Sequence, residues 1–412
     1  MMLTKTSPYF LMIFILLFSI ISCQTEEEQQ IEIIDEGKVE TFNLVINASE
    51  GGSVNSQGGE FNSGESVTIV AEPNEFFQFT DWSDGSTEIE RTITISNDIS
   101  LIANFERIQY TINIVKVQDG GVVSEGGLID AGSEIIIEAA SSYGWEFSSW
   151  SGDISSEENP KNIIVTSDLT IKANFLYAIY LDENQITLKA RDFAQVGSSY
   201  DFEGNSYLIV DYQLLKTLVQ NDENVELVVT TKVGGMYEMF KSKADFNQDI
   251  SRWDTSNVTE MGRMFMNAEN FNQDISHWNT SNVGVLTEAF MNAKRFNQNI
   301  GNWDVSRVGS FSDMFNSATD FNQDIGQWNT ALAQDFFRMF WNASSFNQDI
   351  SSWNTALVGS MGGMFRGATN FNQDLSGWCV TKILSEPSGD FPFSMYSNLS
   401  LSNKPKWGTC PN

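Results

Sequence analysis

The apolar and polar positions of residues 233–378 recur with a fixed spacing of 25 residues. In the second half of each unit, such as residues 258–268, the apolar positions step by three and four. This spacing predicts one apolar face of a short helical or 3₁₀ segment. The first half, around the sequence NQDI, lacks it and is predicted to be extended. The apolar positions of the first unit are Phe246, Ile250, Trp253, Val258, Met261, Met264, Phe265 and Ala268.

Two aromatic positions keep the 25-residue step without interruption. One coil of this length cannot bury its own apolar side chains, so the coils must stack and supply contacts to one another. Equal positions of successive units are therefore expected to form continuous columns in a core. The Phe column is Phe246, Phe271, Phe296, Phe321, Phe346 and Phe371, and the Trp column is Trp253, Trp278, Trp303, Trp328, Trp353 and Trp378.

Before the repeats, residues 41–106 and 107–176 share landmarks in the same order. Short β-branched runs alternate with Gly, Asn and Asp in both segments, a pattern typical of short antiparallel strands joined by tight turns. We therefore expect two tandem all-β modules, each with a small core filled by an aromatic pair. The shared landmarks are Phe79 with Phe147, Trp82 with Trp150, and the sequence ANF at 103–105 and 173–175.

The N-terminus reads as a targeting segment. Its apolar run, residues 9–21, is short and close to the start, which favours a signal peptide over residues 1–22 rather than a spanning helix. Ser22 and Cys23 resemble the lipobox of bacterial lipoproteins, in which the Cys is acylated; an ordinary secretory signal is the alternative. The following QTEEEQQ resembles the surface-export signal of Bacteroidetes lipoproteins, or is a solvated tether within a flexible acidic linker, residues 23–40.

The segments on either side of the repeats are predicted to cap the stack, because terminal units need a polar outer face. Residues 177–232 combine strands, a turn at residues 203–205 and one short helix in the sequence YQLLKTLVQND. Residues 379–412 break the period. In an exported chain, Cys379 and Cys410 are predicted to form a disulfide, with two free thiols as the alternative.

The repeat unit resembles the BspA-like leucine-rich repeat of bacterial surface proteins, with DUF285-type units of 25 residues. The sequence WDTSNVT at residues 253–259 carries this resemblance, although Phe, Ile and Met stand where leucine dominates in ordinary leucine-rich repeats. The two β modules resemble the divergent internalin-type B-repeat, which usually serves as a spacer. The resemblance implies a mainly β fold with short helices: two small all-β modules followed by a leucine-rich-repeat-like solenoid of 25-residue coils.

Charge and composition exclude several function classes. The formal net charge of −31 would repel nucleic acid. His277 is the only histidine and there are three cysteines, which argues against His-dependent catalysis and most metal sites. A uniform ladder of carboxylates also lacks the separated pKa values of a glycosidase pair. We therefore assign no catalytic residue and expect a non-enzymatic protein.

Within each unit, the NQD sequence forms three polar columns. The Asn and Gln side chains are predicted to bond to their own neighbours along each column, about 4.8 Å apart. The Asp column sets like charges together, at a cost of about 1 kcal/mol per neighbouring pair. Backbone N–H groups of the adjacent turn, or alternatively a bound Ca²⁺, would relieve this repulsion. Asn299 interrupts the column without interrupting the period, which favours the backbone.

Ligand contacts are expected at positions that vary between units, because the fold leaves these free. An extended stack of repeated faces makes many weak contacts, so we expect a lipid-anchored outer-membrane surface protein that adheres to an extracellular protein or polysaccharide. Carbohydrate capture by an accessory lipoprotein and a purely structural spacer are the alternatives. The predicted contact residues are Arg252, His277, Asn302 and Gln327, with Asp254, Asn279, Asp304 and Asn329 two residues on.

Overall fold

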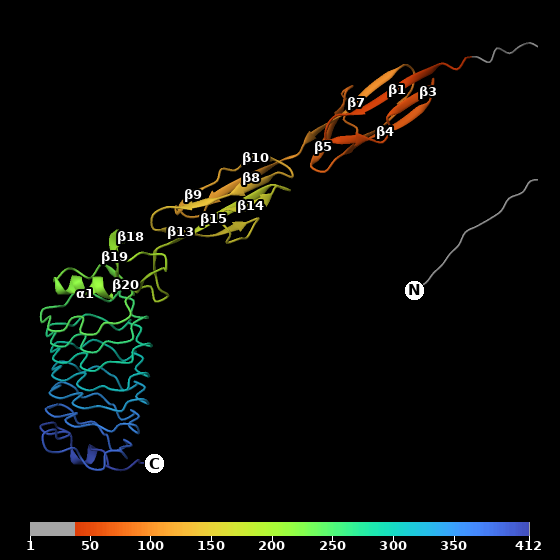
Figure 1. Cartoon of the computed structure of the whole chain (residues 1–412). Coiled ribbons are helices and arrows are strands. Elements are labelled where there is room, and N and C mark those ends of the chain that lie inside the picture. The colour runs from red at the N-terminus through yellow and green to blue at the C-terminus, as the bar shows by residue number, and fades with distance from the viewer. Residues whose placement is uncertain (1–37, 412) are drawn as a thin grey trace, which may run out of the picture. The chain divides into compact units, whose positions relative to one another are not determined.

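The computed structural model describes residues 38–411, apart from the side chain of Val122, and divides the chain into two compact units after residue 108 (Figure 1). The predicted signal peptide, Cys23 and nearly all of the predicted linker lie outside the described residues. Among residues 38–411, no helix combines the length and the apolar character needed to cross a bilayer.

The first β module forms two sheets over one core. Trp82 is fully buried in this core, and its indole N–H donates to the carbonyl of Glu88 at 2.9 Å. The sheet orders are β3-β1-β7-β5 and β2-β4-β6. The strands are β1 (Thr41–Ala48), β2 (Gly52–Val54), β3 (Gly58–Asn62), β4 (Ser66–Pro73), β5 (Phe77–Trp82), β6 (Glu90–Thr94) and β7 (Ile99–Arg107).

The second module repeats this design. Trp150 is buried and donates to the carbonyl of Glu158 at 3.0 Å. The main sheet has the order β10-β8-β15-β13, and two strand pairs, β11-β14 and β12-β9, complete the module. The strands are β8 (Gln109–Lys116), β9 (Gly121–Val123), β10 (Gly127–Asp130), β11 (Glu134–Ile137), β12 (Ala139–Ser141), β13 (Trp145–Gly152), β14 (Lys161–Ile164) and β15 (Leu169–Tyr177).

The expectation of purely antiparallel modules is wrong at one place in each. The first and last long strands, β1 with β7 and β8 with β15, pair in parallel. A parallel pair needs a crossover connection, and the intervening strands of the module provide it. The chain therefore enters and leaves each module on adjacent central strands, with Leu44 opposite Ile99 and Ile112 opposite Leu169.

Residues 178–232 form the mixed segment predicted before the coils. Asp211 ends a strand and caps the helix, because its carboxylate accepts from the N–H of Leu214 at 2.9 Å. Leu215 and Val219 on the helix are buried in a core that continues into the coils. The elements are β16 (Ile179–Leu181), β17 (Leu188–Ala190), β18 (Ser199–Phe202), β19 (Asn205–Asp211), α1 (Tyr212–Gln220) and β20 (Val228–Lys232).

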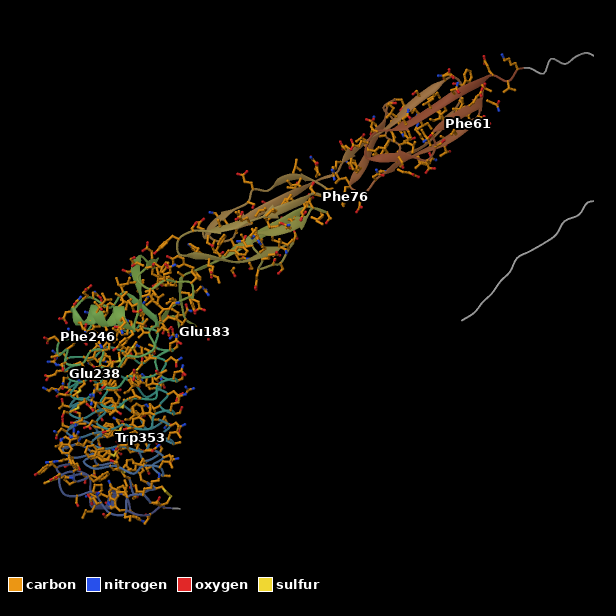
Figure 2. The ribbon with its side chains drawn as sticks, in the orientation of Figure 1. Phe61, Phe76, Glu183, Glu238, Phe246 and Trp353 are labelled. Atoms are coloured by element: carbon orange, nitrogen blue, oxygen red, sulfur yellow. A yellow bond between two sulfur atoms is a disulfide. The ribbon has the colours of Figure 1, made fainter. Side chains whose placement is uncertain are left out.

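The coils that follow lie one above another (Figure 1), with Phe246 on the first coil and Trp353 on a later one (Figure 2). Their Phe and Trp rings stack on the equivalent rings of neighbouring coils, as predicted. Neighbouring rings of the Phe column are 5.7–6.0 Å apart between centroids. Every Trp of the second column is buried, and each indole N–H finds a carbonyl of an earlier segment, as Trp328 does with Ile300 at 3.0 Å. The rings therefore form the core, as expected, and their only polar group is satisfied.

The backbone joins the coils in two directions. Within the turn segment of a coil, the N–H of Met264 donates to Met261 of the same coil at 3.2 Å. The next N–H, that of Phe265, donates to Ala289 of the following coil at 2.9 Å. Alternate residues thus close turns within a coil and bonds between coils, which is incompatible with an α-helical hydrogen-bond pattern.

The predicted helical segment in each repeat is therefore wrong. Residues 261–268 form successive turns, with Arg263 and Asn267 in the left-handed region at φ 55° and 61°. Because a left-handed residue recurs every four positions, the turns direct apolar side chains into the core with the same spacing of three and four residues that a helix would give. Within residues 38–411, the helices are α1 and a 3₁₀ turn, η1 (Leu401–Asn403), so the protein is mainly β with one short α-helix.

The C-terminal tail packs on the last coil. A disulfide joins Cys379 to Cys410. The ring of Phe393 is buried and lies edge-on to Phe365 and Trp407, with centroids 5.4 and 4.9 Å away. The tail thus covers the aromatic core where the repeats end.

Candidate ligand-binding face

The Asn column joins the side chain of one coil to the backbone of the next. The Oδ1 of Asn322 accepts from the N–H of Asn347 at 2.9 Å and from Nε2 of Gln348 at 3.1 Å. The same Nε2 lies 2.9 Å from the backbone carbonyl of Asn322. The prediction that amides bond along their own columns is therefore wrong: Gln side chains bond to the Asn column, and Asn side chains bond to backbone.

The Asp column is held by local backbone, as the uninterrupted period predicted. In each coil the carboxylate accepts from the N–H two residues later, as Asp349 does from Ser351 at 2.9 Å. Asn299 makes the same bond to Gly301 at 3.0 Å, so the neutral residue fits the same turn. Within residues 38–411, no group of three or more His, Cys, Asp or Glu side chains is placed to hold a metal ion.

These turns lower the pKa of their carboxyl groups. The backbone N–H and the hydroxyl of Ser351 hold the pKa of Asp349 below its ordinary value, and Ser376 does the same for Asp374. For Asp274, the Ser276 hydroxyl is the larger of the two causes of the lowered pKa. The charged form is thus favoured in the fold although the neighbouring Asp374 carboxylate opposes it at Asp349.

Asp349→Asn tests this contribution through its pH dependence. A lowered folded pKa stabilises the protein above the unfolded value of about 3.8, and this stabilisation is lost as pH falls through the folded pKa. The difference in unfolding free energy between wild type and variant should be constant from pH 7 to about 5 and should shrink below about pH 4. Urea unfolding at each pH measures it. Asn299→Asp should acquire the same acid-dependent decline, and its absence there would contradict the turn as the cause.

Three of the predicted contact positions are exposed on successive coils. His277, Asn302 and Gln327 are exposed, and within residues 38–411 their side chains form no hydrogen bond. Two residues on, the side chains of the second predicted set are also exposed. Each of them accepts from a nearby N–H, as Asp304 does from Ser306 at 2.9 Å. The members of this second set are Asn279, Asp304 and Asn329.

The first coil departs from this arrangement. Arg252 forms an ion pair with Glu203 at 3.0 Å, so the preceding β18–β19 hairpin engages it. Asp254 is buried, with 2% of its surface exposed, and its Oδ1 accepts from the N–H and hydroxyl of Ser256 at 3.0 and 2.6 Å. The fold therefore does not leave Arg252 and Asp254 free, and the predicted face reduces to the later coils. We name the exposed residues of those coils, His277, Asn302, Gln327, Asn279, Asp304 and Asn329, the polar face.

A cluster of arginines and aromatic rings near the last coil was not predicted. The guanidinium of Arg366 lies 4.3 Å from the ring centre of Trp341, and that of Arg338 lies 4.8 Å from Phe337. Phe391 of the tail completes it, with its ring 5.0 Å from Phe337. These residues come from different coils and from the tail, so no single repeat reveals them. The signal in the sequence is that the positions of Phe337 and Trp341 hold other residue types in the other units.

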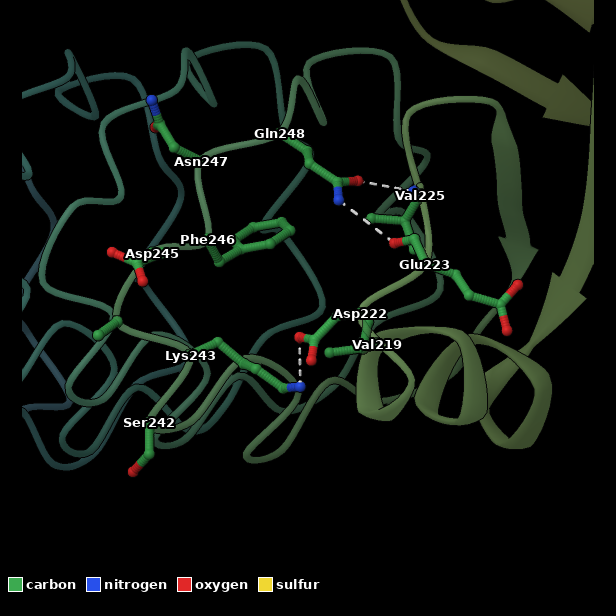
Figure 3. Close-up of a pocket in the computed structure, with 11 residues that line it drawn as sticks. Val219, Asp222, Glu223, Val225, Ser242, Lys243, Asp245, Phe246, Asn247 and Gln248 are labelled. Carbon is green, nitrogen blue, oxygen red and sulfur yellow. Dashed lines mark hydrogen bonds and ion pairs between the residues drawn. The ribbon is translucent and has the colours of Figure 1, made fainter.

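Between α1 and the first coil lies a pocket of about 710 Å³ (Figure 3). The ring of Phe246 lies inside it. On one side, Lys243 pairs with Asp222 at 2.6 Å. On the other, Gln248 donates to the carbonyl of Glu223 at 3.2 Å and accepts from the N–H of Val225 at 2.7 Å. The pocket therefore combines an aromatic surface with a charged rim.

Comparison with known families agrees with the repeats and the modules. Residues 212–324 and 285–391 match the family described as Mycoplasma protein of unknown function, DUF285. Residues 42–109 and 110–179 each match the Divergent InlB B-repeat domain. No curated protein and no solved structure matches the chain. The family matches support a repeat protein of the surface or adhesion type.

Proposed function

We propose that this protein is a non-catalytic, lipid-anchored surface protein whose coils bind an extracellular protein or polysaccharide. In this proposal Cys23 carries the lipid, the two β modules act as spacers, and the coils are a leucine-rich-repeat-like solenoid. One observation carries it: His277, Asn302 and Gln327 are exposed at the same position of successive coils. Side chains held at a spacing of about 4.8 Å can engage an extended or repetitive ligand at several points.

Rigidity favours binding at this face. The core beneath it is continuous, and the turns hold the backbone between the exposed side chains. A preformed surface loses little conformational entropy when a ligand binds. The polar face therefore needs no rearrangement to present its donors and acceptors.

The triple variant His277→Ala, Asn302→Ala and Gln327→Ala tests this function. Each lost hydrogen bond is worth about 0.5–1.5 kcal/mol, so the loss of three should lower the affinity by roughly 10- to 2,000-fold. The full chain would be screened against glycan arrays and extracellular matrix proteins, and the affinity for any bound ligand measured for wild type and variant. Gln334→Ala is the control, because Gln334 is exposed elsewhere on the coils. Equal affinity of the triple variant and wild type would reject the polar face.

Carbohydrate capture is the second candidate, and the arginine–aromatic cluster favours it. Flat rings such as Trp341 stack on sugar rings, and guanidinium groups donate to hydroxyls. Binding of a glycan that survives the triple variant but is lost in Trp341→Ala would favour this function over the polar face.

A further inference from the structure

In each coil from the second onward, two backbone N–H groups donate hydrogen bonds to the preceding coil. The first set joins Asn270, Arg295, Asp320, Ser345 and Asn370 to backbone carbonyls of the preceding coil at 2.9–3.2 Å. The second set joins Asn272, Asn297, Asn322, Asn347 and Asn372 to the Oδ1 of the preceding Asn at 2.9–3.0 Å. Between these two donors, each coil places its Phe on the Phe below.

The first coil has the same two donors without acceptors. Within residues 38–411, the N–H groups of Asp245 and Asn247 donate no hydrogen bond, and both residues are exposed. Phe246 between them is only partly buried, whereas every later Phe of the column is fully buried. Helix α1 and the loop after it accept hydrogen bonds from Lys243, Gln248, Asp249 and Trp253, but from neither of these two N–H groups. The pocket of Figure 3 is thus the place that a preceding coil would fill.

The other end of the Asn column is closed. The N–H of Ser400 donates to Oδ1 of Asn372 at 2.9 Å, and Nδ2 of Asn403 donates to the backbone carbonyl of Asn372 at 3.0 Å. The carbonyl of Asn403 accepts from the N–H of Leu375 at 2.8 Å. Tail residues that are not part of a repeat therefore satisfy the column at its C-terminal end, and no described residue does so at Asp245 and Asn247.

We propose that this open end binds an extended peptide segment of a partner protein, in which an apolar or aromatic residue is followed directly by Asn. The donors of Asp245 and Asn247 are two residues apart in extended chain, about 6–7 Å. That distance exceeds the separation of the two oxygens of one carboxylate. The donor spacing instead matches two acceptors: a backbone carbonyl and the side-chain carboxamide of an Asn three residues later. Ala244 and Asn247 offer this pair of acceptors to the next coil.

The surroundings select further among peptides. An apolar side chain between the two acceptors would lie on the exposed face of Phe246, as Phe271 does on the other side at 5.9 Å. The rim carries the carboxylates of Asp222, Glu223 and Asp245 against the single amine of Lys243. A neutral carboxamide is therefore preferred to a carboxylate, and basic flanking residues are favoured. The mode of binding is addition of a strand-like segment to an open backbone edge.

The peptide AKRFNQNIGN, which copies residues 293–302, is a matched probe because it carries the Phe-Asn pair and two basic residues. Calorimetry with the full chain should detect binding at peptide concentrations up to about 1 mM, equivalent to about −4 kcal/mol. In amide NMR spectra, the signals of Asp245 and Asn247 should shift on binding. The peptide AKRFAQNIGN, which lacks the carboxamide directly after Phe, should bind about 2- to 10-fold more weakly, the loss of one hydrogen bond.

Two protein variants locate the site. Ala244→Trp fills the pocket from an exposed position and should abolish binding. Thr369→Trp, at the equivalent exposed position of the last coil, should leave binding unchanged. The proposal is overturned if AKRFNQNIGN does not bind in this concentration range, if both peptides bind equally, or if Ala244→Trp binds as wild type does.

Discussion

Replacing Phe321 with alanine should lower the free energy of unfolding by about 3–5 kcal/mol, the range for truncating a buried Phe in a core. The ring of Phe321 is fully buried. It stacks on Phe315 at 3.9 Å and lies 6.0 Å from both Phe296 and Phe346. Its loss leaves a cavity that adjoins three coils, and the backbone bonds between the coils prevent them from collapsing into it. Urea unfolding of the full chain, followed by tryptophan fluorescence, measures the change.

Phe246→Ala is the matched control. Phe246 occupies the same position at the end of the column, where one face of the ring is open to the pocket. Its truncation removes contacts with Phe240 and Phe271 only on the covered side. A loss for Phe246→Ala equal to or greater than that for Phe321→Ala would show that the column does not carry the stability of the stack.

Removing the disulfide should make the C-terminal tail open more often. The double variant Cys379→Ser and Cys410→Ser frees a loop whose ends are 31 residues apart in sequence. The loop-closure entropy of such a loop corresponds to about 3–4 kcal/mol of stability. Hydrogen exchange of the amides of residues 380–410 should become faster, because opening of the tail becomes more frequent than opening of the coils. Limited proteolysis should cut the variant first within this segment.

Wild-type protein under reducing conditions is the control for the substitutions. It should show the same faster exchange in residues 380–410, with the amides of the central coils unchanged. The contacts of Phe393 with Phe365 and Trp407 remain in both cases, so the tail should stay docked on average. Unchanged exchange in the tail after reduction would show that these contacts alone hold it.

The columns could be predicted from the sequence because one register relates every unit. Phe and Trp at a constant step of 25 residues leave one arrangement that buries them all, and the structure has it. The turns were mistaken for a helix because apolar spacing alone cannot separate the two. The signal was present in another form: Gly363 and Gly367 stand at the positions of Arg263 and Asn267. Glycine and Asn both tolerate a left-handed conformation, and neither is typical of a helix interior.

The candidate site was predictable only where it follows the repeat. His277, Asn302 and Gln327 are exposed because their position points outward in every later coil. Arg252 holds the same position, but its partner Glu203 lies 49 residues earlier and belongs to a hairpin outside the repeat. The rings of Trp341 and Phe391 meet across 50 residues for the same reason. Contacts between a repeat and a non-repeated neighbour have no periodic signature.

The bonds between successive coils are made by equivalent positions 24 to 28 residues apart, from the second coil to the last. Any interior coil therefore presents nearly the same upper and lower surfaces as its neighbours. Duplication or loss of a whole 25-residue unit in the gene would preserve the interfaces between coils and both ends of the stack. Insertion or deletion of a single residue would instead misalign every column beyond it. Descendants of this gene can thus differ in reach by whole coils while keeping the same fold.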